Sequence, residues 1–161
     1  VHTKVDRKPA TVHKGDFTMQ SDNEKMLQEI VQNTEMGKNT LDEMMGLTRD
    51  QRLKNEMMRQ KNEYRRLNQQ AHTALAALGA QAEGQSAAAK MGVSMGIRSR
   101  TMLDKSTRNL ATMLAEGSGQ GVLNCKRAEK DYPTASPGAQ QLNRELCDMQ
   151  THAEQTWREF V

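Results

Sequence analysis

The sequence predicts an all-α protein: an elongated helical hairpin or bundle of long amphipathic helices, preceded by an extended N-terminal arm. The chain has only three prolines, and none falls between Lys14 and Tyr132, so no helix breaker of this kind interrupts that interval. Apolar residues recur there every three or four positions, which is the helical period. Twelve methionines against 3% aromatic residues favour adaptable helix faces over a rigid pocket.

The chain divides into three segments: an arm at residues 1–20, long helices at 21–116 and a C-terminal helical hairpin at 117–161. Its 161 residues fit one domain or one elongated set of helices. The 23 basic and 20 acidic residues leave a net charge of +3, and cations and acids are interleaved between Arg49 and Arg66. Such mixing is typical of a solvated surface, whereas a nucleic-acid interface gathers its cations on one stripe.

The arm shows no helical period and carries four cations, Lys4, Arg7, Lys8 and Lys14. Two interpretations are open. The arm is a terminus without fixed structure, or it becomes ordered when its cations meet the acidic surface of a neighbouring subunit.

We expect the first helix to begin at Ser21, whose side chain can cap the first turn while Glu24 completes a capping box. One apolar seam comprises Leu27, Ile30, Thr34, Gly37, Leu41, Met44 and Thr48. After a change of phase near Asp50, a second seam comprises Leu53, Met57, Gln60, Tyr64, Leu67, Ala71, Ala74 and Leu78. These seams predict one long helix, or two collinear helices broken between Gly46 and Asp50.

The next stretch has a small residue at every fourth position: Ala76, Ala80, Gly84, Ala88, Gly92 and Gly96. Residues four apart share a helix face, and small side chains let a neighbouring backbone approach closely. Each glycine weakens a helix by about 1 kcal/mol, so this face is expected to need a packing partner. The alternative is an alanine-rich linker. Gly79 is the expected bend, and polar residues such as Glu83 and Lys90 interrupt any membrane-spanning run.

A further apolar face is expected in the helix that follows and ends at Glu116. It comprises Ile97, Met102, Leu103, Leu110, Met113 and Leu114. The segment Gly117 to Gly121 contains three glycines and is expected to form a turn. A phosphate-binding loop is not expected there, because Val122 and Leu123 stand where that motif needs Lys and Ser or Thr. A short helix over 123–131 is expected next.

The loop at 132–138 precedes the last predicted helix, which runs from about Pro137 to Phe160. Ser136 can cap this helix and Pro137 suits its first position. Its apolar side comprises Leu142, Leu146, Met149, Ala153, Trp157 and Phe160. Trp157 is the only tryptophan, and it is either a core anchor or an interface hot spot.

Cys125 and Cys147 flank the same loop, and a hairpin turning there would bring them side by side. A disulfide between them would restrict the unfolded chain by roughly 3 kcal/mol. It would also imply an oxidising compartment, the periplasm or the cell exterior. The alternative is two reduced cysteines buried as small apolar residues.

Catalytic, cofactor and metal motifs are not recognisable. The sequence has no nucleophile turn, no His-Glu-x-x-His and no dinucleotide fingerprint. Its four histidines are scattered without ligand spacing. Narrow apolar seams also provide few concave walls for a pocket. We therefore expect a non-enzymatic protein without a metal, a cofactor or a small-molecule substrate.

Three features define the layout of the chain: the amphipathic segment from Ser21 to Leu27 onward, the Ala/Gly-rich middle and the Cys125/Cys147 hairpin. This layout resembles that of small helical extracytoplasmic subunits of bacterial type IV secretion and conjugation systems, including the minor pilin or pilus-tip family. The resemblance covers the plan from about Ser21 to Val161 and carries over no functional residue. It implies a periplasmic or pilus-associated protein that binds other subunits.

Three functions follow as hypotheses. The first is a structural subunit of a bacterial envelope or secretion assembly, possibly a homo-oligomer, acting through its arm, its small-residue face and the helix that bears Trp157. The second is an internal or ejection protein of a phage virion, in which the cysteines should be reduced. The third is a helical nucleic-acid-binding module, whose affinity should fall steeply with salt.

Overall fold

This computed structural model describes residues 20–161, and these residues contain five helices. They are α1 (Asp22–Met45), α2 (Gln51–Ala77), α3 (Ala87–Thr101), α4 (Thr107–Asp131) and α5 (Pro137–Arg158). These residues include no strand, so the prediction of an all-α protein is confirmed. The predicted arm, with Lys4, Arg7, Lys8 and Lys14, lies outside the described residues apart from its last position.

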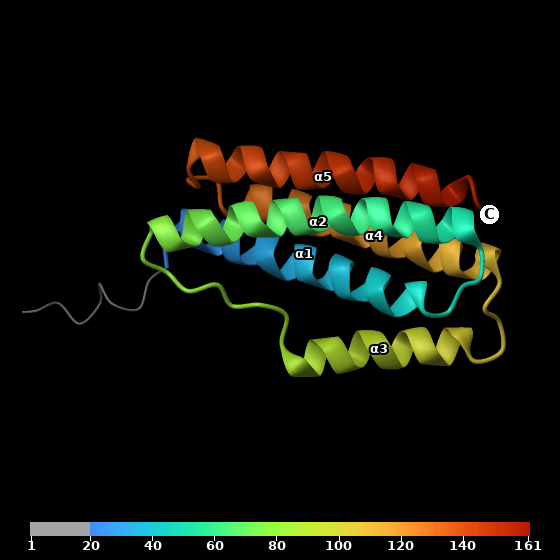
Figure 1. Ribbon diagram of the computed structural model, residues 1–161. Helices are drawn as coiled ribbons and strands as arrows, with labels where there is room; N and C mark the ends of the chain where they lie inside the picture. The colour runs from blue at the N-terminus through green and yellow to red at the C-terminus, as the bar shows by residue number, and fades with distance from the viewer. Residues whose placement is uncertain (1–19) are drawn as a thin grey trace, which may run out of the picture.

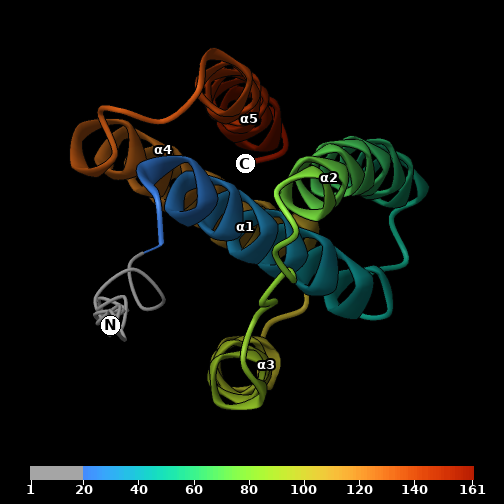
Figure 2. The ribbon, with the colours of Figure 1, turned by 90° about the vertical axis from the view of Figure 1, so that its left-hand side faces the viewer.

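Two helical hairpins pack side by side to form a four-helix bundle (Figure 1). One hairpin is α1 with α2 and the other is α4 with α5, and each is joined by a short connection. Viewed from the end in Figure 2, α1 lies in the middle of the fold, and α3 stands apart on the far side of α1 from α5. The chain is therefore a bundle with one accessory helix.

Each helix begins at a polar side chain that accepts a hydrogen bond from a backbone N–H of the first turn. The capping residues are Ser21, Asp50, Ser86, Ser106 and Ser136. The caps expected at Ser21 and Ser136 are confirmed, at 3.1 Å from the Glu24 nitrogen and 3.2 Å from the Ala139 nitrogen. Pro137 occupies the start of α5, as its missing N–H allows.

The two predicted N-terminal seams are buried, but the helices that carry them are not collinear. The break between Gly46 and Asp50 lies where it was expected, and α2 turns back there to lie antiparallel against α1. The end of the second seam is also shifted, because Leu75 is fully buried whereas Leu78 is exposed. The two seams therefore face each other within one hairpin.

The expected turn at Gly117–Gly121 is wrong. Residues 107–131 form one continuous helix through all three glycines, so the short helix expected at 123–131 is the second half of α4. The expected domain boundary after residue 116 falls inside this helix. The break lies earlier, at 102–106, and leaves Met102 and Leu103 exposed rather than on an apolar face with Leu110.

The small-residue row does not lie on one helix. Ala76 lies in the last turn of α2, Ala80 and Gly84 lie in an irregular segment, and Ala88, Gly92 and Gly96 lie in α3. The chain bends at Gly79, as expected, with a φ of 71° that favours glycine. A spacing of four therefore does not produce one continuous face here. A packing role for these residues against another subunit stays a prediction.

Candidate functional site

A cavity of about 460 Å³ lies between α3 and the bundle. Its walls are mainly apolar and come from α1, α3 and α4; they include Met36, Leu41, Met44, Val93, Ile97, Met113 and Leu114. Deeper side chains come from α2, α4 and α5: Gln60, Tyr64, Ser118, Gln150 and Trp157. Its size and its mixture of apolar walls with a few polar groups are typical of small-molecule sites. Narrow seams were expected to provide few concave walls for a pocket, but α3 stands off the bundle and leaves a cavity beside it.

Beneath the cavity, one polar side chain from each bundle helix forms a connected group, here called the polar layer: Asn33, Tyr64, Cys125 and Gln150. The Gln150 amide nitrogen donates to Asn33 Oδ1 at 2.7 Å and to the Tyr64 hydroxyl at 3.2 Å. The Cys125 thiol donates to Gln150 Oε1 at 3.4 Å. Satisfied polar groups in a core favour one register of the helices over its alternatives.

Burial keeps both ionisable members of the polar layer neutral. It raises the pKa of Tyr64 to about 12, against the hydrogen bond from Gln150, which lowers it. It also raises the pKa of the Cys125 thiol to about 12, with a further contribution from the neighbouring Cys147. A buried thiol of this kind is a poor nucleophile, because the reactive form is the thiolate.

Two glycines make room for the polar layer. A Cβ at Gly37 in α1 would overlap the ring of Tyr64, and a Cβ at Gly121 in α4 would overlap the amide of Gln150. These helical glycines are therefore positions of close approach between helices. The sequence placed Gly37 on a seam but assigned Gly121 to a turn.

Hydrogen bonds from α1 fasten α3 and the segment before it. The Gln28 amide donates to the Gln81 carbonyl and accepts from the Glu83 nitrogen, both at 2.7 Å. The Glu35 carboxylate accepts from the Gln85 nitrogen at 2.6 Å, and Glu43 accepts from the Ser94 hydroxyl at 2.8 Å. Only Ile97 and Thr101 of α3 are buried. Polar contacts therefore provide much of the attachment of α3, together with the buried side chain of Ile97, whereas apolar burial dominates in the bundle.

The opposite side of α3 is apolar and exposed. Ala88, Met91, Gly92 and Met95 share one helix face, here called the outer face. The Met91 and Met95 side chains are 65% and 62% exposed, and Leu103 in the following loop is 97% exposed. A Cβ built at Gly92 or Gly96 would meet no atom within 4 Å. Large apolar side chains gathered in this way are typical of an interaction surface.

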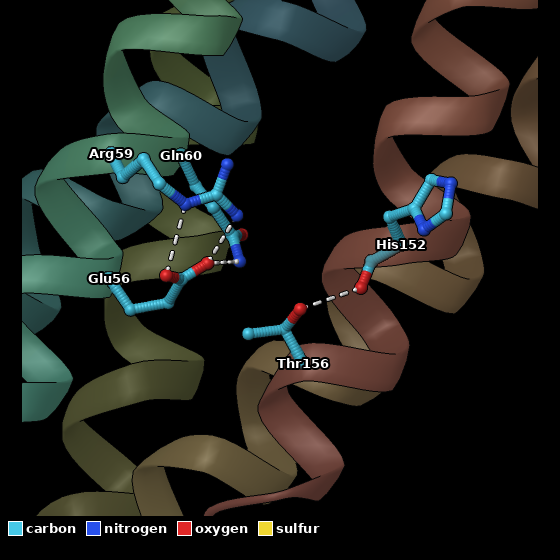
Figure 3. Close-up of polar contacts among 5 residues, drawn as sticks. All are labelled: Glu56, Arg59, Gln60, His152 and Thr156. Atoms are coloured by element: carbon cyan, nitrogen blue, oxygen red, sulfur yellow. Dashed lines mark hydrogen bonds and ion pairs between the residues drawn. The ribbon is translucent and has the colours of Figure 1, made fainter.

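Ordinary surface contacts surround the bundle away from α3. In Figure 3, Glu56 on α2 accepts hydrogen bonds from Arg59 and Gln60, while the Thr156 hydroxyl on α5 donates to the His152 carbonyl at 3.0 Å. Burial alone would raise the pKa of Glu56, but the hydrogen bonds from Arg59 and Gln60 lower it.

The expected disulfide is not formed. Cys125 and Cys147 lie on the predicted hairpin, α4 and α5, but both are free thiols. Cys125 is buried and hydrogen-bonded within the polar layer, and Cys147 is half-buried. The alternative of reduced cysteines therefore describes the structure.

Trp157 is a core anchor. It is 1% exposed and lies 6.1 Å from Phe160 between ring centroids, while the Arg52 guanidinium lies 5.4 Å from the Phe160 ring centre. Phe160 remains partly exposed at the end of α5. The structure thus favours the anchor interpretation for Trp157 over a hot spot at a subunit interface.

The sequence missed the cavity and most of the polar layer. A clue was present, because Asn33, Tyr64 and Gln150 lie at or beside apolar seam positions, where polar residues need buried partners. Within residues 20–161, no group of three or more His, Cys, Asp or Glu side chains could hold a metal ion. Over the same residues, no helix has the length and apolar character needed to cross a bilayer.

Comparison with known proteins gives no relative, since no family model, curated protein or solved structure matches this chain.

Proposed function

We propose that this chain is a non-enzymatic structural subunit that binds partner proteins of a larger helical assembly through α3. The single observation that supports the proposal most is the exposed outer face, with Met91 and Met95; Leu103, in the loop after α3, is exposed as well. Burying such side chains against a partner would contribute roughly 25 cal/mol per Å² of apolar surface removed from water. Methionine adapts to irregular partner surfaces, which suits a docking helix.

Close approach supports the same role. Gly92 lies between Met91 and Met95 on the outer face, and there is open space above it. A partner helix can therefore contact the backbone of α3 at Gly92 while the two methionines pack beside this contact. This is the part of the small-residue row that remains available for packing.

Two settings are proposed for the assembly. The layout resembles the helical subunits of secretion and conjugation systems, which would place the chain in the periplasm or outside the cell. The two free thiols favour the second setting, a phage virion, because they give no support to an oxidising compartment. In either setting, the chain works by helix packing rather than by chemistry.

Sedimentation velocity of the complex isolated from the producing organism tests the docking role. The double variant Met91→Gln with Met95→Gln keeps side-chain length and helix propensity but makes the outer face polar. It should leave the chain unassembled. The matched control is Met58→Gln, which alters an exposed methionine of α2 and should assemble normally. Equal assembly of both variants, or a wild-type chain that is monomeric in its own host, would refute the proposal.

Intact mass after thiol alkylation, with and without prior reduction, separates the two settings. Two thiols that are alkylated without a reductant favour the virion. Two thiols that require a reductant favour the envelope.

A further inference from the structure

The deepest polar groups of the cavity have hydrogen-bonding capacity that the protein does not use. Ser118 in α4 is 5% exposed as a residue and lines the cavity, and its hydroxyl makes no hydrogen bond to any residue of the described chain. Other buried hydroxyls behave differently, since Thr34 and Thr101 donate to the carbonyl four residues earlier at 2.8 and 2.7 Å. Among the described residues, no side-chain nitrogen or oxygen that is itself buried lacks a partner, so the Ser118 hydroxyl is accessible, and the cavity that Ser118 lines is the space it faces.

Two neighbours in the cavity lining add to this capacity. Gln60 is buried and its amide nitrogen is held by Glu56 at 2.9 Å, so its carbonyl oxygen is left as an acceptor without a donor among the described residues (Figure 3). The Tyr64 hydroxyl accepts from Gln150 and donates to no residue in the described range. A set of donors and acceptors is thus present among the buried lining residues of a cavity whose walls are mainly apolar.

The charge distribution excludes a charged group at that inner end. The buried lining consists of neutral side chains, and the high pKa of Tyr64 keeps its phenol neutral as well. The charged lining residues are Arg100 and Glu116, which are exposed at the mouth and form an ion pair with each other at 2.6 Å. An ionised ligand group placed beside Ser118 would lose its hydration without gaining a counter-ion.

We propose that the cavity binds an uncharged amphiphile, an alkyl chain bearing one neutral hydroxyl or amide group. The chain packs against Met36, Met44, Val93 and Ile97, and the polar group exchanges hydrogen bonds with Ser118, Gln60 and Tyr64. The site is distinct from the outer face, because the ligand lies between α3 and the bundle rather than on the exposed side of α3.

Trp157 supplies the reporter, since the single tryptophan of the chain lines the cavity. Titration of the full chain with 1-octanol should change its fluorescence in a saturable manner, and calorimetry should give the same dissociation constant. Sodium octanoate has the same chain length but a charged head, and it should bind at least about tenfold more weakly, because its carboxylate would be buried without a counter-ion. Octanoate that binds as tightly as octanol would overturn the proposed polarity of the site.

Two glycines of α3 give matched variants. Gly96 lines the cavity whereas Gly92 does not, and a Cβ meets no atom within 4 Å at either position. Gly96→Leu should fill the cavity and abolish octanol binding, while Gly92→Leu should bind octanol like the wild type. Ser118→Ala should weaken binding by about tenfold, because one hydrogen bond is lost.

If Gly96→Leu does not fold, Gly117→Leu fills the same cavity from α4, where a Cβ also meets open space. Non-saturable binding, or saturable binding that survives the filled cavity, refutes the site. Failure here does not affect the docking proposal, whose variants lie at Met91 and Met95.

Discussion

The bundle and α3 are built by different forces. In the bundle, leucine, isoleucine and methionine side chains from α1, α2, α4 and α5 are almost completely buried around the polar layer. In α3, two residues are buried, and side-chain hydrogen bonds from α1 provide much of the attachment. Apolar burial contributes free energy in proportion to area, whereas each hydrogen bond exchanged with water contributes little net. The bundle should therefore resist unfolding while α3 opens locally.

The largest expected effect is on the free energy of unfolding, when one buried side chain is truncated in the bundle and one in α3. Leu67→Ala in α2 should lower the free energy of unfolding by about 2–5 kcal/mol, because it leaves a cavity in the bundle. Ile97→Ala in α3 should lower it by less than half as much, since local release of α3 precedes global unfolding. Urea denaturation measures the first effect and native-state hydrogen exchange of α3 amides the second. Equal losses in urea would show that α3 is an integral part of the bundle.

High pH should unfold the bundle through two groups of the polar layer. The folded protein keeps Cys125 and Tyr64 protonated to about pH 12, whereas their ordinary pKa values are 9.0 and 10.0. The unfolded chain therefore releases protons first, and stability that is complete below pH 9 falls as the pH rises. Each group contributes a slope of about 1.4 kcal/mol per pH unit, so roughly 4 kcal/mol should be lost by pH 11.

The matched control for the alkaline effect is Cys125→Ala. This variant is compared with the wild type by the change of its stability with pH rather than by its absolute stability. Between about pH 9 and 10 its urea midpoint should fall less steeply than that of the wild type, because Cys125 no longer titrates while burial still raises the pKa of Cys147. An unchanged slope in this range would assign the effect to groups outside the polar layer.

Local signals in the sequence predicted the bundle well because they act within one helix. The period of three and four, the cap at Ser21 and the Ser136-Pro137 start of α5 depend on neighbouring residues alone. The direction of α2 was not predictable in the same way. A seam has the same pattern whether its helix continues α1 or folds back on it, so the connection at 46–50 was located but not its turn.

The secondary structure predicted at glycine residues was wrong in both regions, because the conformation of a glycine depends on tertiary packing. The sequence predicts a turn at 117–121, yet the packing of α5 on α4 keeps the segment helical. Gly121 lets the Gln150 side chain approach α4 closely. The spacing of four predicts a helical position for Gly84, yet this residue lies in an irregular segment against the carboxylate of Glu35. Propensity alone cannot supply these outcomes, since the partner side chains are 29 and 49 residues away in the sequence.

A pair of glycine substitutions should have opposite signs in the two regions. Gly121→Ala should destabilise the protein by about 1–3 kcal/mol, because the new Cβ displaces the buried Gln150 amide. Gly92→Ala should raise helix stability by up to about 1 kcal/mol, because its Cβ meets open space and alanine is the better helix former. Thermal unfolding of the two variants measures both changes. A neutral Gly121→Ala would mean that the polar layer repacks without cost.

The smallest expected effect concerns the attachment of α3. Gln28→Ala removes two of the hydrogen bonds from α1 to the segment before α3, and exchange of the Glu83 amide should accelerate about fivefold for roughly 1 kcal/mol lost. The urea midpoint should change less than in Leu67→Ala, because the affected backbone lies outside the bundle. Gln32→Ala, at an exposed position of the same helix, is the control and should leave Glu83 exchange unchanged. If Gln28→Ala leaves the Glu83 amide as protected as before, hydrogen bonds from α1 are not what holds α3, and apolar contact at Ile97 must do so instead.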